Sequence, residues 1–279
     1  MEPISIIALS AAIGGGAGKF AEKAWDSGEK WLKTFFKDHN ELVQQKANEN
    51  SLDFLSELAQ RIKKLEDQNK VSADKIIESQ NQPDFTILLQ KAIITASQTD
   101  NKEKHVLLAT LVTERLTSSS ESIFTLTSKM ACDTISYLTV NQIKILGFLA
   151  NAKYIRPNLP PIQNLPINIF HEFVENWITS RLTPYHDLTF RSLDFKHLES
   201  LSCLRIDELV YCKFDHLFNR GNLKVDFTKI KNRQLYTELK TIWDNSEFES
   251  SGLTTLGQLI GIIASDNLSK TYTDIGSWK

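Results

Sequence analysis

The chain has 279 residues, 41% of them hydrophobic and 24% charged, which suffices for one large hydrophobic core or two smaller ones. Its 32 basic and 34 acidic residues leave a formal net charge of −2, which excludes a global positive field for binding nucleic acid. The three cysteines include no C-x-x-C pair. An odd number at irregular spacing argues against a disulfide framework and predicts reduced thiols in a cytoplasmic protein.

The first distinctive stretch is glycine-rich: SAAIGGGAGKF, residues 10–20. A phosphate-binding loop needs a glycine five residues before its Gly-Lys pair, and Ser or Thr directly after the pair. Those positions hold Ile13 and Phe20, which argues against a nucleotide site. The uncharged run from Pro3 to Gly18 lacks the basic start of an export signal, and it is shorter than the roughly 20 apolar residues that span a bilayer. We therefore expect a hinge that leads into a helix.

Residues 19–37, KFAEKAWDSGEKWLKTFFK, predict a strongly amphipathic helix. Its two Trp and three Phe fall on one side, and its five lysines fall on the other, where Asp26 interrupts them. Aromatic rings opposite lysines are typical of helices that bind anionic membrane surfaces. The alternative is a surface helix whose rings pack on the protein's own core. The candidate membrane- or partner-binding residues are Lys19, Lys23, Trp25, Lys30, Trp31, Phe35, Phe36 and Lys37.

An N-terminal helical segment is thus predicted for residues 1–38, and a helical bundle for residues 39–138. The bundle contains almost no period-two alternation, and its helices have readable start signals. Those signals are Ser51, Ser72, Pro83, Thr99 or Asp100, and Ser118, which has capping-box spacing to Glu121.

Residues 139–279 change in character. A helix capped by Thr139 ends before the proline-rich stretch RPNLPPIQNLP, and further helices are predicted at NIFHEFVENWITSRL and after Asp194. Two short strands are predicted around the turn Asn219–Asn222. A last apolar helix carries Gly257 and Gly261, a spacing that permits close helix approach. The order predicts a winged-helix-like domain with a short β-hairpin, in a chain that is mainly α.

Two segments carry a family resemblance: LQKAIITASQTDNKEKHVLLATLVTERL, followed by TISYLTVNQIKILGFLA. Together they resemble the core of bacterial abortive-infection alpha (Abi-alpha) proteins and their uncharacterised Legionella and Veillonella relatives. The segments FKHLESLSCL and LTTLGQLIGIIA are similar to the closing parts of such proteins. The resemblance implies a bacterial, defence-associated protein with a mostly helical fold, and it transfers no catalytic residue.

Candidate catalytic and metal-binding groups are weak. His171 and Glu175 share a helical face, but a zinc-protease helix needs histidine where Glu175 stands. Cys203 and Cys212, with the nearby His197 and His216, are too widely spaced for a zinc knuckle and are interpreted as buried thiols. His105 lies in a strongly apolar helix and is interpreted as a core-edge or surface residue. We therefore predict no catalytic residue, no metal and no cofactor, and the sequence identifies no small-molecule substrate.

The preferred interpretation is an intracellular interaction protein, an anti-phage effector or adaptor that acts through its N-terminal helices. Its partner would be another protein, a second copy of the chain, or an anionic membrane at the inner face. One alternative is a winged-helix regulator that binds nucleic acid, a less favoured partner, through its basic residues Arg220, Lys224, Lys229, Lys231 and Arg233. A second alternative is a cryptic hydrolase centred on His171 and Glu175 or on Cys212 and His216.

Overall fold

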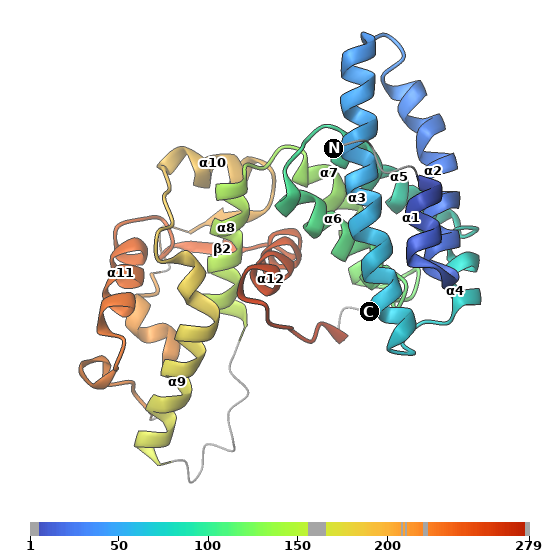
Figure 1. The fold of residues 1–279 in the computed structure, drawn as a ribbon. Helices are drawn as coiled ribbons and strands as arrows, with labels where there is room; N and C mark the ends of the chain where they lie inside the picture. Colours follow the sequence, from blue (N-terminus) through green and yellow to red (C-terminus); the bar gives the residue numbers. More distant parts are fainter. Residues whose placement is uncertain (1–5, 156–165, 208, 210, 220–222, 277–279) are drawn as a thin grey trace. The chain divides into compact units, whose positions relative to one another are not determined.

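A computed structural model describes residues 6–155, 166–207, 209, 211–219 and 223–276. The chain divides into two compact units, which are described separately below. Unit 1 comprises Met1–Tyr137 with Ile275–Lys279, and unit 2 comprises Leu138–Asp274. Most described residues of both units lie in helices (Figure 1), which confirms the mainly helical class.

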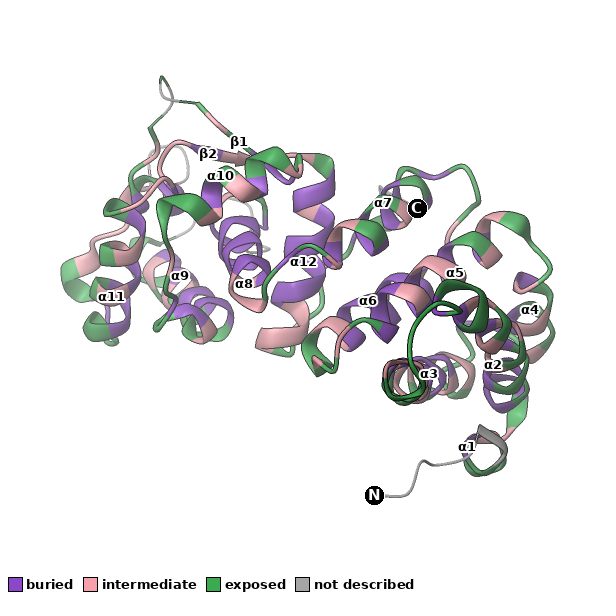
Figure 2. Cartoon of the chain, turned by 90° about the horizontal axis from the view of Figure 1, so that it is seen from above, coloured by how far each residue is buried: buried purple, intermediate pink, exposed green. Residues whose placement is uncertain are grey.

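Unit 1 is a helical bundle. Its helices are α1 (Ile6–Ile13), α2 (Gly15–Phe35), α3 (Glu41–Asp67), α4 (Ala73–Ser79), α5 (Pro83–Ser97), α6 (Lys102–Arg115) and α7 (Ile123–Ile135). Helix α3 packs against α2, α5 and α6, and α5 also packs against α7. Figure 2 colours the buried parts of these helices purple. In the core, Phe20 of α2 meets Phe85 of α5 edge to face, with ring centroids 6.0 Å apart.

Three predicted helix starts in unit 1 are wrong. Helix α3 begins ten residues before Ser51, because Asn40 accepts a hydrogen bond from Val43 N at 3.0 Å and so caps the helix earlier. Ser51 lies inside α3, where its hydroxyl donates to Ala47 O. The cap of α6 is Asn101, and the cap of α7 is Ser122 rather than Ser118. For α6 and α7, several Ser, Thr, Asn or Asp side chains near the helix start compete for one capping position, whereas Ser51 satisfies its hydroxyl inside a longer helix.

Unit 2 combines helices with two short strands. Its elements are α8 (Val140–Leu149), the π-helical turn η1 (Ala150–Tyr154), α9 (Ile167–Leu182), the 3-10 turn η3 (Thr183–Tyr185), α10 (Ser192–Ser200), β1 (Leu204–Ile206), the 3-10 turns η4 (Phe214–Phe218) and η5 (Phe227–Lys229), α11 (Arg233–Asp244), β2 (Ser251–Leu253) and α12 (Thr255–Ser269). Thr139 caps α8, as its sequence predicts, and it forms a capping box with Gln142. Helix α12 packs along α8, and a Cβ on Gly261 would lie 2.4 Å from Leu146 O, so glycine permits this close approach.

Residues 220–222 of the predicted hairpin turn lie outside the described residues, and the described residues on either side of them form no strand. The flanking segments form the 3-10 turns η4 and η5. Their rings are held by other aromatic side chains, since Phe214 packs against Trp243 and Phe227 stacks on Tyr236 with centroids 4.2 Å apart. The strands that do form, β1 and β2, pair antiparallel with Leu204 opposite Leu253. A sheet of two such distant segments does not establish the winged-helix arrangement.

No helix in the described ranges is both long enough and apolar enough to cross a membrane.

Candidate functional site on helix α2

The glycines at the start of α2 allow a sharp turn and a close approach of two helix backbones. Gly14 and Gly15 adopt φ values of +64° and +62°, which turn the chain sharply between α1 and α2. A Cβ on Gly18 would lie 2.4 Å from Ser10 O, so α1 can rest directly on α2 only because this position is glycine. The carboxylate of Glu66 accepts a hydrogen bond from Gly16 N at 2.8 Å, and so the chain's own anion lies at this helix start.

Folding covers part of the predicted binding face of α2. Phe36 is buried, and Trp25 and Trp31 are half-buried. Phe35, the last residue of α2, keeps 49% of its surface exposed. The four predicted lysines of the opposite face are all exposed: Lys19, Lys23, Lys30 and Lys37. The apolar face of α2 is therefore largely core, and its free surface is the lysine side together with the end of the helix.

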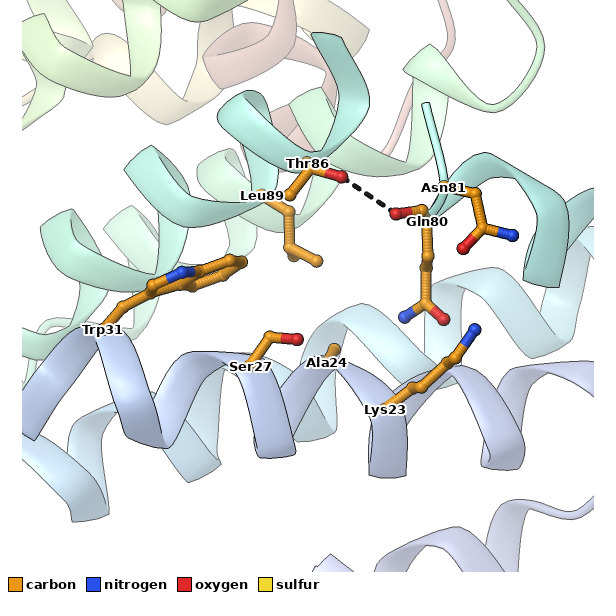
Figure 3. Close-up of a pocket in the computed structure, with 8 residues that line it drawn as sticks. All are labelled: Lys23, Ala24, Ser27, Trp31, Gln80, Asn81, Thr86 and Leu89. Atoms are coloured by element: carbon orange, nitrogen blue, oxygen red, sulfur yellow. Dashed lines mark hydrogen bonds between the residues drawn. The ribbon is translucent and has the colours of Figure 1, made fainter. Parts of the chain in front are cut away.

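A pocket of about 150 Å³ lies along one flank of α2 (Figure 3). Three α2 side chains one helical turn apart, Lys23, Ser27 and Trp31, form one side. The remaining lining residues are Ala24 of α2, Gln80 and Asn81 between α4 and α5, and Thr86 and Leu89 of α5. Two predicted binding residues, Lys23 and Trp31, thus belong to a concave site that also needs residues some 50 positions away in the sequence.

The amide of Gln80 is the most informative group in this pocket. Its Nε2 donates a hydrogen bond to Phe20 O at 3.0 Å, which fixes the orientation of the amide. Its Oε1 is buried and has no hydrogen-bond partner among the described residues. A buried acceptor without a partner costs about 1–3 kcal/mol. Lys23, which lines the same pocket, is exposed, and no described carboxylate forms an ion pair with it.

A second pocket in unit 1, of about 450 Å³, is lined by Arg115, whose charge is already paired with a carboxylate. Arg115 is buried, and its Nη2 lies 2.6 Å from Asp84 Oδ2. The same guanidinium also donates to Gln82 Oε1 and to Ser118 O. These bonds hold the start of α5 against the end of α6, so we interpret Arg115 as structural.

The candidate catalytic side chains of unit 2 accept hydrogen bonds from backbone N–H groups. His171 Nε2 accepts a hydrogen bond from Asp226 N at 3.0 Å. Glu175 Oε1 accepts from Lys231 N at 2.9 Å and from Asn232 N at 3.3 Å. Both side chains therefore fasten the segment around η5 to α9. Within the described ranges, no cluster of three His, Cys, Asp or Glu side chains could hold a metal ion.

The thiols differ in burial. Cys203 is buried, and its burial raises the pKa of the thiol to about 12. Burial also raises the pKa of Cys132 well above its usual range. Cys212 is only half-buried, and its Sγ lies 4.0 Å from Lys213 O. Of the nearby histidines, His197 Nδ1 is bonded to Gln142 Oε1 and His216 is exposed. His105 is buried, with Nε2 2.8 Å from Thr99 O, which agrees with its interpretation as a residue of the core edge.

The basic residues of the nucleic-acid alternative lie on the surface of unit 2. Lys224, Lys229, Lys231 and Arg233 are exposed, and Arg220 lies outside the described residues. Lys229 forms an ion pair with Asp226 at 3.3 Å. The carboxylate of Glu175 is bonded to the same segment through Lys231 N. Acidic groups thus accompany the cations, which weakens attraction for phosphates.

Comparison with known proteins identifies a family for this chain but no individual relative. No functionally curated protein and no solved structure matches the chain. The sequence model of one family matches residues 18–230, from the first turn of α2 to the residue after η5, and so includes the pocket beside α2. The chain belongs to this family, which is uncharacterised.

Proposed function

We propose that the protein is an interaction protein that attaches to an anionic membrane surface through the end of its α2–α3 hairpin. The single observation that carries this proposal is the pair of large apolar side chains exposed there. Phe35 at the end of α2 is 49% exposed, and Leu42 at the start of α3 is 63% exposed. Figure 1 shows the turn between these helices extending past the other helices of unit 1.

The turn that carries these side chains is held rigidly. Gln44 Nε2 donates hydrogen bonds to Phe36 O and His39 O, at 3.2 and 2.9 Å. The ring of Phe36 is buried and contacts both Phe35 and His39. Phe35 and Leu42 are therefore presented by a fixed hairpin, which lowers the entropic cost of inserting them into an interface.

The charge around the turn fits an anionic surface. Exposed lysines outnumber acidic residues between positions 30 and 46, and they are Lys30, Lys33, Lys37 and Lys46. Each lysine near an anionic membrane contributes about 1 kcal/mol. Lysines beside exposed apolar side chains are the composition of interfacial helices.

The biological setting of the proposal is anti-phage defence at the inner face of a bacterial membrane. The two core segments that resemble Abi-alpha proteins, residues 89–116 and 134–150, cover most of α5, all of α6, the end of α7 and all of α8. This resemblance supports an effector or adaptor role, and a phage-plating assay on cells expressing the full chain tests it. The role predicts fewer plaques with the wild-type chain than with a variant that has lost Phe35 and Leu42.

Vesicle flotation tests the membrane attachment. The double substitution Phe35→Ser and Leu42→Ser removes the exposed apolar surface at the turn. Burying such side chains contributes about 1.5–3 kcal/mol each, so we expect the partition of the full chain onto vesicles with anionic headgroups to fall at least tenfold.

The matched control is Ile123→Ser with Leu126→Ser on α7. These side chains are 58% and 49% exposed, so the control removes a similar apolar area from another helix. Equal loss of flotation in both variants would show nonspecific adsorption. An absence of flotation for the wild-type chain would overturn the membrane proposal. The exposed side chains of the hairpin would then bind another protein or a second copy of the chain.

A further inference from the structure

Helix α7 is apolar on its solvent-exposed face as well as on its buried face. The exposed residues of α7 are Ile123, Leu126, Met130 and Asp133, so three of the four are large and apolar. A surface helix normally turns polar and charged residues to solvent, whereas a helix that is apolar on all sides is a buried one. The outer face of α7 therefore has the composition of a contact surface.

The spacing of these four residues, which we call the α7 seam, is that of a coiled coil. They follow one another at intervals of three, four and three residues, which correspond to the a and d positions of the heptad repeat. Residues at this spacing form one narrow stripe along a helix, and such a stripe packs against a matching stripe on a second helix. The α7 seam thus selects another helix as its partner.

Helix α5 adds an ion pair and one more apolar side chain to this surface. Lys91 Nζ of α5 forms an ion pair with Asp133 Oδ2 of the α7 seam. Ile87 of α5, which is 45% exposed, lies one helical turn before Lys91, and Met130 lies one turn before Asp133. The surface therefore combines large apolar side chains with one cation and one anion.

This pair of opposite charges favours a second copy of the chain as the partner. In a two-fold symmetric contact, a residue i of one copy meets a residue j of the other, and j meets i. Lys91 of each copy can then face Asp133 of the other, because the two side chains keep 33% and 51% of their surface exposed. Antiparallel pairing of the seams also sets Leu126 of each copy beside Met130 of the other. A surface with charges of one sign would instead need a partner of opposite charge.

We propose that the α7 seam is the interface of a homodimer, in which the α7 helices of two copies pair antiparallel and Lys91 of each copy contacts Asp133 of the other. The seam contains neither Phe35 nor Leu42, and dimerisation is measured without lipid. The dimer and the membrane attachment can therefore hold or fail separately. Flotation of the α7 control variant is compared with the wild type below the dimerisation concentration, where both are monomers.

Sedimentation equilibrium of the full chain tests the dimer. We expect the wild type to form a species of twice the chain mass at micromolar concentration. Leu126→Ser removes one apolar side chain from the seam of each copy, so we expect the dissociation constant to rise at least tenfold. Ile167→Ser on α9 is the matched control, because Ile167 and Leu126 are 48% and 49% exposed, and we expect it to leave the dimer unchanged.

Charge reversal tests the contact between Lys91 and Asp133 of the two copies. Lys91→Asp leaves two carboxylates at this point of the surface and Asp133→Lys leaves two ammonium groups, so we expect each variant alone to dimerise at least tenfold more weakly. An equimolar mixture should recover association as a heterodimer, because an acidic surface then faces a basic one. An ion pair that acts only within one chain predicts no such recovery.

Three results would each overturn the proposal. The first is a wild-type chain that remains monomeric. The second is an equal loss of dimer in Leu126→Ser and Ile167→Ser, which would place the contact elsewhere. The third is a mixture of Lys91→Asp and Asp133→Lys that associates no better than either variant alone.

Discussion

At the scale of single residues, burial determines which reactive-looking side chains are available. Cys132 and Cys203 lie in the cores of units 1 and 2, and Cys212 is half-buried. His171 accepts a hydrogen bond from Asp226 N and Glu175 accepts one from Lys231 N, so both fix backbone. Gln80 Oε1 is one of several buried polar atoms without a hydrogen-bond partner among the described residues, and no local sequence pattern singles it out.

Thiol labelling tests this assignment. Because burial raises the pKa of Cys203 to about 12, its protonated form dominates at pH 8, and the same direction holds for Cys132. We expect one thiol, Cys212, to react with a disulfide reagent at pH 8 in the folded protein, and all three to react in denaturant. The variant Cys212→Ser should abolish the fast reaction. Rapid labelling of a second thiol in that variant would contradict the assigned burial.

At the scale of elements, the helix boundaries follow local chemistry, but the choice among neighbouring caps does not. Ser118 and Ser122 both precede α7. Ser122 Oγ accepts from Thr125 N at 3.2 Å, whereas Ser118 Oγ donates back to Glu114 O. Ser118 therefore closes the preceding helix, and Ser122 starts the next one.

Alanine substitution distinguishes the two serines. Ser122→Ala removes the cap of α7 and should lower the free energy of unfolding by about 1 kcal/mol. Ser118→Ala removes only a hydroxyl bond to a carbonyl at the end of α6, so we expect a change within about 0.5 kcal/mol. Urea denaturation followed by circular dichroism measures both values. A larger loss for Ser118→Ala would favour the capping box that the sequence predicts.

At the scale of the whole molecule, the chain forms two units with separate cores. The sequence changes character near Leu138, and unit 2 runs from Leu138 to Asp274. Its core is a cluster of aromatic rings in which Phe148 of α8 contacts Trp243 and Phe248 at 5.7 and 5.1 Å. These rings come from segments nearly a hundred residues apart, yet all belong to unit 2.

Expression of residues 138–274 alone tests the independence of unit 2. Because its aromatic core lies within these residues, we expect a helical fragment that unfolds in one cooperative transition. Phe148→Ala should destabilise the fragment by about 3–5 kcal/mol, because Phe148 is fully buried. A fragment with little helix, or one insensitive to this substitution, would contradict a separate core.

The sequence by itself determined the helical class and most helix positions, because amphipathic periodicity and capping residues act over a few neighbouring positions. It also indicated the glycine hinge before α2. Only the tertiary structure decided which rings of α2 are covered, since α3, α4 and α5 supply the covering surface. Local sequence patterns likewise could not predict the β1–β2 pairing or the pocket beside α2. Leu204 pairs with Leu253, and Lys23 lies beside Gln80, because burial of apolar surface brings distant segments together.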